Sequence, residues 1–155
     1  NIFYNLIKKK FQIIVTSPGH ESGRSIIENY IKKLSKEFNQ IKYIDSLGHE
    51  ALFNILPYCK FVIGNSSSGI IEVPYFKIPT INIGDRQKGR YMHLSVINTG
   101  YSKQSIVKAI NLACNVNFNK KIKRMKYNFG TGNTAKKIIK KIKNLNINQD
   151  LLRKL

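Results

Sequence analysis

The chain has 155 residues, 42% of them apolar and 23% charged, which is the balance expected of one globular domain with its own core. No apolar run reaches the ~18 residues that a bilayer-spanning helix needs, and the N-terminal lysines follow a short apolar stretch instead of preceding it. We therefore expect a cytoplasmic protein with no membrane contact, neither membrane-spanning nor secreted.

The formal net charge of +19 is unevenly distributed, since residues 101–155 contain a single acid, Asp150. Clustered Lys and Arg are typical of nucleic-acid binding, so a basic nucleic-acid-binding module is one interpretation. However, no aromatic interleaving like the signature of an RNA-binding sheet appears among the lysines, and abundant Lys, Asn and Ile are what an AT-rich genome produces. We expect no nucleic-acid partner and favour a small anionic ligand, because basic surfaces also attract nucleotide phosphates.

Short apolar runs of β-forming residues alternate with helical periodicity, which predicts a parallel sheet covered by helices. The predicted strands are 11–15, 41–44, 61–64, 80–83 and 94–97. The predicted helices are centred on 27–34, 52–56, 69–76, 106–114 and 138–145, and 115–128 is a short helix or a connection. We predict one doubly wound α/β domain over residues 1–155, with a frayed tail at 147–155.

Ligands of such sheets bind at the carboxyl ends of the strands, and each polar motif here follows a predicted strand. The first loop, TSPGHESGR, holds His20, Glu21 and Arg24. Adjacent titratable groups can act as acid and base, or orient a substrate. A solvated loop in which Ser22 caps the next helix explains the sequence nearly as well.

The third predicted strand runs into GNSSSGIIE, residues 64–72. Its backbone N–H groups, the hydroxyls of Ser66, Ser67 and Ser68, and a glycine that permits close approach would together bind a diphosphate. Alternatively, one serine caps the helix and the others are solvated. Glu72, one turn on, can accept hydrogen bonds from sugar hydroxyls or complete a capping box.

Two further loops offer ligand groups. NIGDRQKGR, after the fourth strand, carries Arg86, Lys88 and Arg90, and Arg binds phosphate in a bidentate manner, although basic surface loops are common in so lysine-rich a chain. DSLGHEALF, after the second strand, contains Phe53, which would either stack on a flat base or pack in the core. FGTGN, at 129–133, is mainly a helix-start signal.

Known cofactor and metal signatures are missing from the sequence. It has neither a Walker A motif nor GxGxxG, and its two cysteines, Cys59 and Cys114, lack metal-ligand spacing. We expect both cysteines to be reduced core thiols, and we predict no cofactor and no metal.

The segment FVIGNSSSGIIEVPYFKIPTINIGDRQKGR, residues 61–90, resembles the UDP-N-acetylglucosamine 2-epimerases, especially the hydrolysing branch that feeds sialic-acid-type sugar synthesis. The likeness extends from TSPGHESGR through SLG to FGTGN. It implies a Rossmann-like, three-layer α/β/α domain that forms the C-terminal half of a GT-B architecture. The implied partners are a UDP-sugar substrate, the N-terminal domain of the same parent protein and, at full length, a second copy in a homodimer.

By this resemblance, Ser66, Ser67 and Gly69 match the family's diphosphate-binding turn, Glu72 the acid that holds the ribose, and Arg86 a basic residue facing the phosphates. Phe53 falls where relatives place an aromatic ring against the uracil, and residues 46–48 lie in the loop that contacts the base through its backbone. The predicted UDP-binding residues are Ser46, Leu47, Gly48, Phe53, Asn65, Ser66, Ser67, Ser68, Gly69, Glu72 and Arg86.

The implied reaction eliminates UDP across C1–C2 of the sugar and then adds water with inversion at C2, giving N-acetylmannosamine and UDP. His20 and Glu21 are the catalytic candidates here, and the remaining acid and base groups are expected in the N-terminal half. The sequence departs from many relatives where Pro18 and Gly19 displace the loop histidine, and in FGTG instead of FGDG. UDP-N,N′-diacetylbacillosamine is an alternative substrate, and a GT-B glycosyltransferase donor domain an alternative function.

Overall fold

The structure is a computed structural model that describes residues 2–19 and 22–145. His20, Glu21 and the predicted frayed tail at 147–155 lie outside the described residues. The chain forms two compact units, residues 1–125 and 126–155, which we describe separately. None of the described helices is both long and apolar enough to cross a bilayer.

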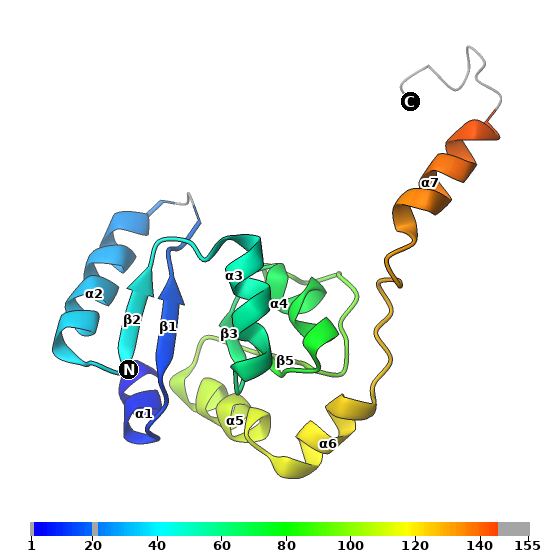
Figure 1. Ribbon diagram of the computed structural model, residues 1–155. Helices are drawn as coiled ribbons and strands as arrows, with labels where there is room; N and C mark the ends of the chain where they lie inside the picture. Colours follow the sequence, from blue (N-terminus) through cyan, green and yellow to red (C-terminus); the bar gives the residue numbers. More distant parts are fainter. Residues whose placement is uncertain (1, 20–21, 146–155) are drawn as a thin grey trace. The chain divides into compact units, whose positions relative to one another are not determined.

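Unit 1 contains short strands, α-helices and two 3₁₀ turns (Figure 1). The strands are β1 (Ile13–Thr16), β2 (Ile41–Ile44), β3 (Val62–Gly64), β4 (Thr80–Ile83) and β5 (Val96–Thr99). The helices are α1 (Ile2–Lys8), α2 (Arg24–Glu37), α3 (Gly48–Ile55), α4 (Ser68–Ile71), α5 (Lys103–Ala113) and α6 (Val116–Arg124), with 3₁₀ turns η1 (Leu56–Tyr58) and η2 (Val73–Phe76).

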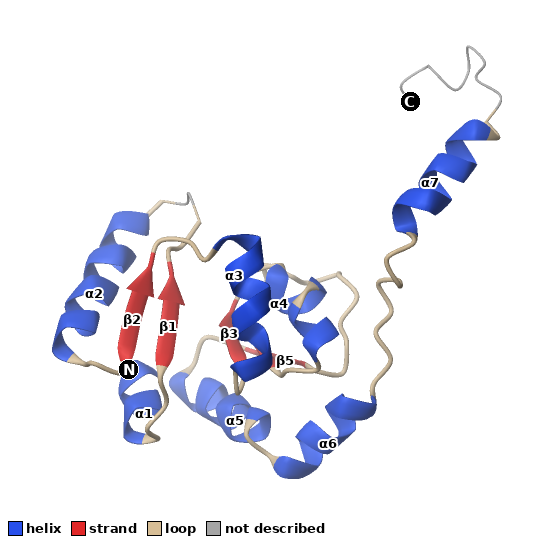
Figure 2. Cartoon of the chain, in the orientation of Figure 1, coloured by secondary structure: helices blue, strands red, loops and turns tan. Residues whose placement is uncertain are grey.

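All the strand pairs among the described residues are parallel, which confirms the predicted α/β class. The strands form two ladders: β1 pairs with β2, placing Ile13 opposite Ile41, and β3–β4–β5 form the other, placing Ile81 opposite Ile97. Helix α2 packs on β2, and α5 packs on β4 and β5. Helices flank the strands in Figure 2, as parallel connections require.

The main core lies between the β3–β4–β5 ladder and α5. Its buried residues are Leu6, Ile81, Ile106, Ala109, Ile110 and Ala113. A second cluster, Leu56, Val73 and Ile78, packs under the loop that leads into β4. Burying an isoleucine side chain contributes about 1.5–3 kcal/mol of stability. The two clusters include Ile81 of β4 and Ile78 just before it, so they hold β4 in place.

One helix was not predicted, and another decides between two alternatives that the sequence left open. Helix α1 was not predicted; it forms where Leu6 reaches the α5 core and is buried there. Segment 115–128, predicted as a short helix or a connection, contains α6, whose N-cap Asn115 side chain accepts a 2.9 Å hydrogen bond from the Phe118 N–H. Cys59 and Cys114 are free and half-buried, and burial raises the pKa of the Cys59 thiol.

Unit 2 contains α7 (Thr134–Lys143), which begins at the predicted start signal after Gly132. Ile138, Ile139 and Ile142 are about half exposed, with relative accessibilities of 53%, 53% and 56%. The helix therefore presents both lysines and apolar side chains to solvent within its own unit.

Candidate functional site

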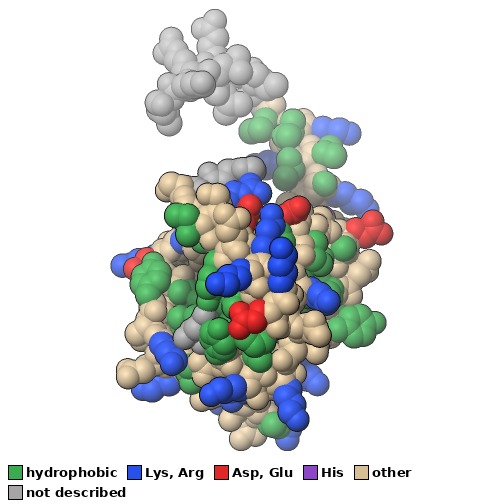
Figure 3. All heavy atoms as spheres, turned by 90° about the vertical axis from the view of Figure 1, so that its left-hand side faces the viewer, with side chains coloured by type: hydrophobic (Ala, Val, Ile, Leu, Met, Phe, Trp, Pro, Cys, Tyr) green, Lys and Arg blue, Asp and Glu red, His purple; other side chains and the backbone are tan. Residues whose placement is uncertain are grey.

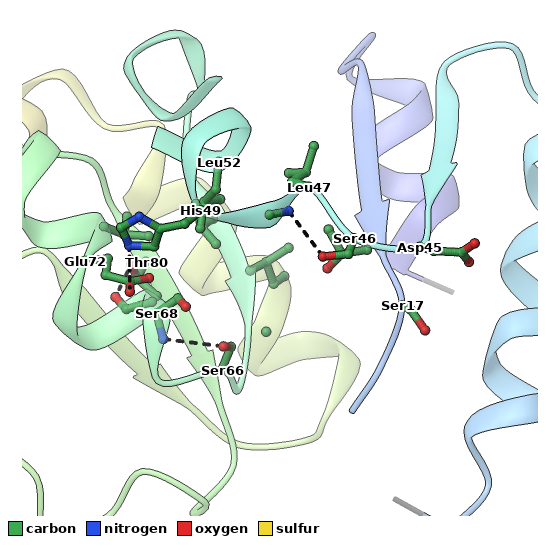
Figure 4. A pocket seen from close by; sticks show the side chains of 17 residues that line it. Ser17, Asp45, Ser46, Leu47, His49, Leu52, Ser66, Ser68, Glu72 and Thr80 are labelled. Atoms are coloured by element: carbon green, nitrogen blue, oxygen red, sulfur yellow. Dashed lines mark hydrogen bonds and ion pairs between the residues drawn. The ribbon is translucent and has the colours of Figure 1, made fainter. Parts of the chain in front are cut away.

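A cavity of about 410 Å³ in unit 1 lies where the two ladders end (Figure 4). One side comes from the end of β1 and the loop after β2, which supply Ser17 and Asp45; the other comes from β3, α4 and β4. This is the strand-end position at which parallel α/β sheets bind ligands. The predicted residues that line it are Ser46, Leu47, Gly48, Ser66, Ser68, Gly69 and Glu72.

Four other predicted residues, Phe53, Asn65, Ser67 and Arg86, are not among the described lining residues. None of the described lining residues is Lys or Arg; the charged or titratable ones are Asp45, Glu72 and His49. An anion bound here would therefore depend on backbone N–H and hydroxyl donors at the cavity wall, with guanidinium groups farther out.

The serine turn connects β3 to α4. The Ser66 hydroxyl accepts a long, 3.4 Å hydrogen bond from the Ser68 N–H, and Ser67 is the N-cap residue but makes no side-chain capping bond. The N–H groups of Ser66 and Ser67 donate to none of the described residues. Because α4 has four residues, its macrodipole is small, and these individual donors are what the turn offers an anion.

Gly69 has a structural role that differs from the predicted one. Its carbonyl accepts a 2.6 Å hydrogen bond from the buried Thr80 hydroxyl, and a Cβ at this position would lie 2.7 Å from Thr80 Cγ2. The missing side chain thus lets α4 approach strand β4 closely, in addition to any approach by a ligand.

Glu72 lies on the cavity wall with its side chain 28% exposed, and its Oε1 is 3.7 Å from His49 Nε2. Among the described residues, its carboxylate makes no capping-box hydrogen bond, so that alternative reading of Glu72 is wrong. The pair is an ion pair whenever the imidazole is protonated, and Figure 4 shows the two side chains facing each other.

Phe53 lies behind the cavity wall. Its ring centroid is 4.1 Å from that of His49 and 5.3 Å from that of Phe76, which it meets edge-on. His49 was not among the predicted site residues, although it lines the cavity and its side chain is 72% exposed. Its position directly after the Gly48 turn was the sequence signal that could have identified it.

Arg86 links two strand-end loops. Its Nη1 donates a 3.4 Å hydrogen bond to the Asn65 carbonyl, which also accepts a 2.7 Å bond from Nε2 of the buried Gln87. The Asn65 carbonyl thereby joins the loop after β3 to the loop after β4. The Arg86 side chain is exposed. Asn65, whose carbonyl it contacts, directly precedes the cavity-lining Ser66.

The end of β1 is held by a carboxylate. Oε1 of Glu28 accepts 2.5 Å hydrogen bonds from the Ser17 hydroxyl and from Arg24 Nε. The Ser17 bond, and then the Arg24 bond, lower the pKa of Glu28 below its usual value. Ser22 is not the helix cap: α2 follows Gly23, whose φ of 85° suits glycine.

Basic side chains are spread over the face shown in Figure 3, with acidic side chains among them. Helix α2 alone carries Lys32, Lys33 and Lys36. Such a surface raises the local concentration of anions without selecting one, so selectivity must come from the cavity.

Comparison with known proteins identifies relatives. The family model described as UDP-N-acetylglucosamine 2-epimerase matches residues 1–143. Polysialic acid biosynthesis protein P7 of Escherichia coli is 39% identical to the chain over 109 residues, which is 70% of the chain's length. UDP-N-acetylglucosamine 2-epimerase of Neisseria meningitidis serogroup B is 36% identical over 105 residues, which is 67% of the chain's length. It is 40% identical over 96 residues, 60% of its length, to GDP/UDP-N,N′-diacetylbacillosamine 2-epimerase (hydrolyzing) of Campylobacter jejuni.

These matches cover 28%, 27% and 24% of the respective relatives. The chain therefore spans about a quarter of the length of the proteins it resembles. The family model, in contrast, covers nearly all of it, including the strand-end loops that form the cavity. On this evidence, the chain belongs to the UDP-N-acetylglucosamine 2-epimerase family.

Proposed function

We propose that residues 1–155 form the UDP-binding C-terminal domain of a cytoplasmic, hydrolysing UDP-N-acetylglucosamine 2-epimerase. The observation that carries this proposal is that two separate loops contribute predicted residues to one strand-end cavity in a chain of this family. These residues are Ser46, Leu47 and Gly48 from one loop and Ser66, Ser68, Gly69 and Glu72 from the other. In the proposed complex, the serine turn binds the diphosphate and Glu72 accepts hydrogen bonds from the ribose hydroxyls.

The proposed reaction removes the C2 proton of the sugar as the C1–O bond to UDP breaks, leaving a C1=C2 double bond. Water then adds: its oxygen bonds to C1 and a proton returns to C2 from the opposite face, which balances as UDP-N-acetylglucosamine plus water giving N-acetylmannosamine plus UDP. The N–H donors of Ser66 and Ser67 would stabilise the charge that develops on the departing diphosphate.

None of the described lining residues is assigned here as the acid or base of this scheme. His20 and Glu21 are proposed to take part, and the others are assigned to an N-terminal domain of the same parent, which is proposed to dimerise. The shared length supports this assignment, because the chain matches only about a quarter of each relative. We therefore expect the 155-residue chain to bind UDP without releasing it from UDP-N-acetylglucosamine.

Calorimetry with UDP tests the binding half of the proposal. We expect Ser68→Ala, Glu72→Gln and Arg86→Ala each to weaken UDP binding by about 10- to 100-fold. Ser68→Ala and Arg86→Ala each remove a donor to the charged diphosphate, and Glu72→Gln removes the charge of the proposed ribose acceptor. Ser35→Ala, on the far helix α2, is the matched serine control and should bind as the unaltered chain does. Equal affinity in all variants would contradict the assignment.

A second substrate, UDP-N,N′-diacetylbacillosamine, is favoured by the names of the Campylobacter jejuni relative and of a Legionella pneumophila relative, 27% identical over 153 residues. Products of the full-length protein separate the candidates. Free N-acetylmannosamine supports the first substrate and a free diacetylated sugar the second. A glycoside formed with an added acceptor would support a GT-B glycosyltransferase, and steeply salt-dependent DNA binding without a response to UDP would support the nucleic-acid alternative.

A further inference from the structure

Gln87 places a buried amide next to the serine turn, and its burial does not serve the stability of the core. The side chain is 2% exposed, and its Nε2 donates a 2.7 Å hydrogen bond to the Asn65 carbonyl. Its Oε1 is also buried, yet it accepts no hydrogen bond from any of the described residues. Burying a polar oxygen without a partner lowers stability, so an apolar side chain of the same length would suit the fold as well. Local exceptions of this kind are expected at functional sites.

The amide of Gln87 projects from a short hydrogen-bonded turn. The turn directly follows β4, the central strand of the β3–β4–β5 ladder. Within it, the Lys88 N–H donates a 2.9 Å bond to the Asp85 carbonyl, and the Arg90 N–H donates a 3.3 Å bond to the Gln87 carbonyl. The backbone of Gln87 is therefore fixed on a buried strand, and its side chain reaches across to the loop after β3.

The bond from Gln87 sets the direction of one donor in the serine turn. The carbonyl of Asn65 and the N–H of Ser66 belong to one peptide group, and none of the described peptide bonds is cis. In a planar trans peptide group the C=O and the N–H point in opposite directions. Because Gln87 holds the carbonyl, the Ser66 N–H points away from Gln87, and it donates to none of the described residues. Ser66 lines the cavity (Figure 4), so the bond orients an available donor at the cavity wall.

Arg86 holds the same carbonyl less firmly. Its Nη1 is 3.4 Å from the Asn65 oxygen, beyond the usual N–H···O range of about 2.7–3.2 Å, and its side chain is exposed. An exposed guanidinium can exchange this bond for one to water or to a bound anion, whereas the buried amide of Gln87 cannot. The orientation of the peptide group therefore depends mainly on Gln87.

We infer that Gln87 is a positioning residue that aims the Ser66 N–H at the diphosphate by holding the Asn65 carbonyl, a role that rests on the proposed binding of UDP. Gln87 is not among the described residues that line the cavity, so it acts without touching the ligand. If the bond is lost, the peptide group can rotate and turn its carbonyl oxygen toward the cavity, where the oxygen would repel a phosphate. The amide thus raises affinity by preorganising a donor.

Calorimetry with UDP and with inorganic pyrophosphate tests this role. Gln87→Met keeps the length of the side chain and removes both amide groups. It should weaken the binding of both ligands about five- to tenfold, because both present the diphosphate that the Ser66 N–H would contact. Its midpoint of thermal unfolding should not fall, because the change removes an unpartnered buried oxygen together with one hydrogen bond. Gln87→Glu should weaken binding at least as much at neutral pH, because a carboxylate has no proton to donate to the Asn65 carbonyl.

Gln40→Met is the matched control. The Gln40 amide also donates to backbone carbonyls, with bonds of 3.4 Å to Ile7 and 3.2 Å to Phe11. These residues lie before the amino ends of β1 and β2, and the cavity lies beyond the carboxyl ends. Gln40→Met should therefore bind UDP and pyrophosphate as the unaltered chain does.

The amide proton of Ser66 gives a readout in the unaltered chain itself. Its NMR resonance should shift when pyrophosphate is added, and the shift should be smaller in Gln87→Met. A Ser66 resonance that stays in place while pyrophosphate binds to the unaltered chain would overturn the inference. So would unchanged affinity for both ligands in either Gln87 variant.

Two further outcomes separate this inference from its alternatives. Weaker binding in Gln87→Met together with a lower midpoint of unfolding would show that Gln87 supports the fold as a whole, which would overturn the positioning role and leave the proposed function standing. Failure of the unaltered chain to bind UDP would overturn the proposed function, and this inference with it.

Discussion

Thr80 and Gly69 are joined by a buried hydrogen bond of 2.6 Å from the threonine hydroxyl to the glycine carbonyl. The contact ties the first turn of α4, which carries the cavity-lining Ser68, to strand β4 in the centre of its ladder. Because Thr80 is 3% exposed and Gly69 is also buried, neither group can exchange this bond for water. The geometry of the serine turn therefore depends on packing beneath it.

We predict that Gly69→Ala lowers the free energy of unfolding by about 1–3 kcal/mol, because the new methyl group would overpack against Thr80 Cγ2. Thr80→Ser removes that methyl group and keeps the hydroxyl, so it should restore part of the loss in the double variant. Urea denaturation measures both effects. Additive losses in the double variant would show that the two side chains do not compete for the same space.

Thr80→Val keeps the shape of the side chain and removes the donor. We expect the free energy of unfolding to fall by about 1–3 kcal/mol, since the Gly69 carbonyl would be buried without its partner. Thr99→Val, on the neighbouring strand, is the control, because the Thr99 hydroxyl makes only a 3.5 Å bond to the Gly100 carbonyl. Similar losses in both variants would contradict a special role for the Thr80 hydroxyl.

Glu28 should make stability depend on acid pH. The hydrogen bond from Ser17, followed by the bond from Arg24, lowers the pKa of Glu28 below 4.5, so its contribution is present above that pH and is lost as pH falls through the folded-state pKa. Glu28→Gln should remove this part of the pH dependence, whereas Glu37→Gln at the other end of α2 should retain it. Chemical denaturation from pH 6 to about pH 3 checks this, and identical profiles for wild type and Glu28→Gln would refute it.

His93 should act in a different pH range. It is 3% exposed, and burial lowers its pKa below 6.5, although a hydrogen bond to the Ile70 backbone opposes the shift. The unfolded chain therefore binds the proton more readily, and stability should decline as pH falls below about 6.5. We expect His93→Gln to lose this decline in denaturation measurements between pH 7.5 and about pH 5.5. An unchanged decline in the variant would assign it to other groups.

The pattern of strands could be predicted because short runs rich in β-branched residues mark them, even where, as in β1, alternate residues are exposed. The ends of the strands could not. Predicted strand 11–15 begins at Ile13, since the Phe11 ring packs edge-on against Phe61 at 5.3 Å outside the ladder. Predicted strand 94–97 begins at Val96, whose N–H bonds to the His93 carbonyl in a turn while Leu94 remains 55% exposed.

The position of the cavity was also predictable, because strand ends and polar loops coincide in the sequence. The sequence did not predict which side chains line the cavity. Phe53 and His49 share one helix face, but Phe53 packs against Phe76 whereas His49 lines the cavity. Likewise, the sequence shows Arg86 near Gln87 but not that both donate to the Asn65 carbonyl. These outcomes depend on contacts between distant segments, which a local pattern does not contain.

The cavity lies between two separate ladders, so a bound ligand would contact both of them. Among the described residues, no backbone ladder joins β1 to β3, yet Thr16 and Ser17 line the cavity on one side and residues 62–64 on the other. A molecule bound between them would connect two ladders that no backbone hydrogen bonds between β1 and β3 join in the described residues. Hydrogen exchange at the amides of β1 and β3 should then slow together when a ligand fills the cavity, because the ligand reduces local opening of both ladders of unit 1.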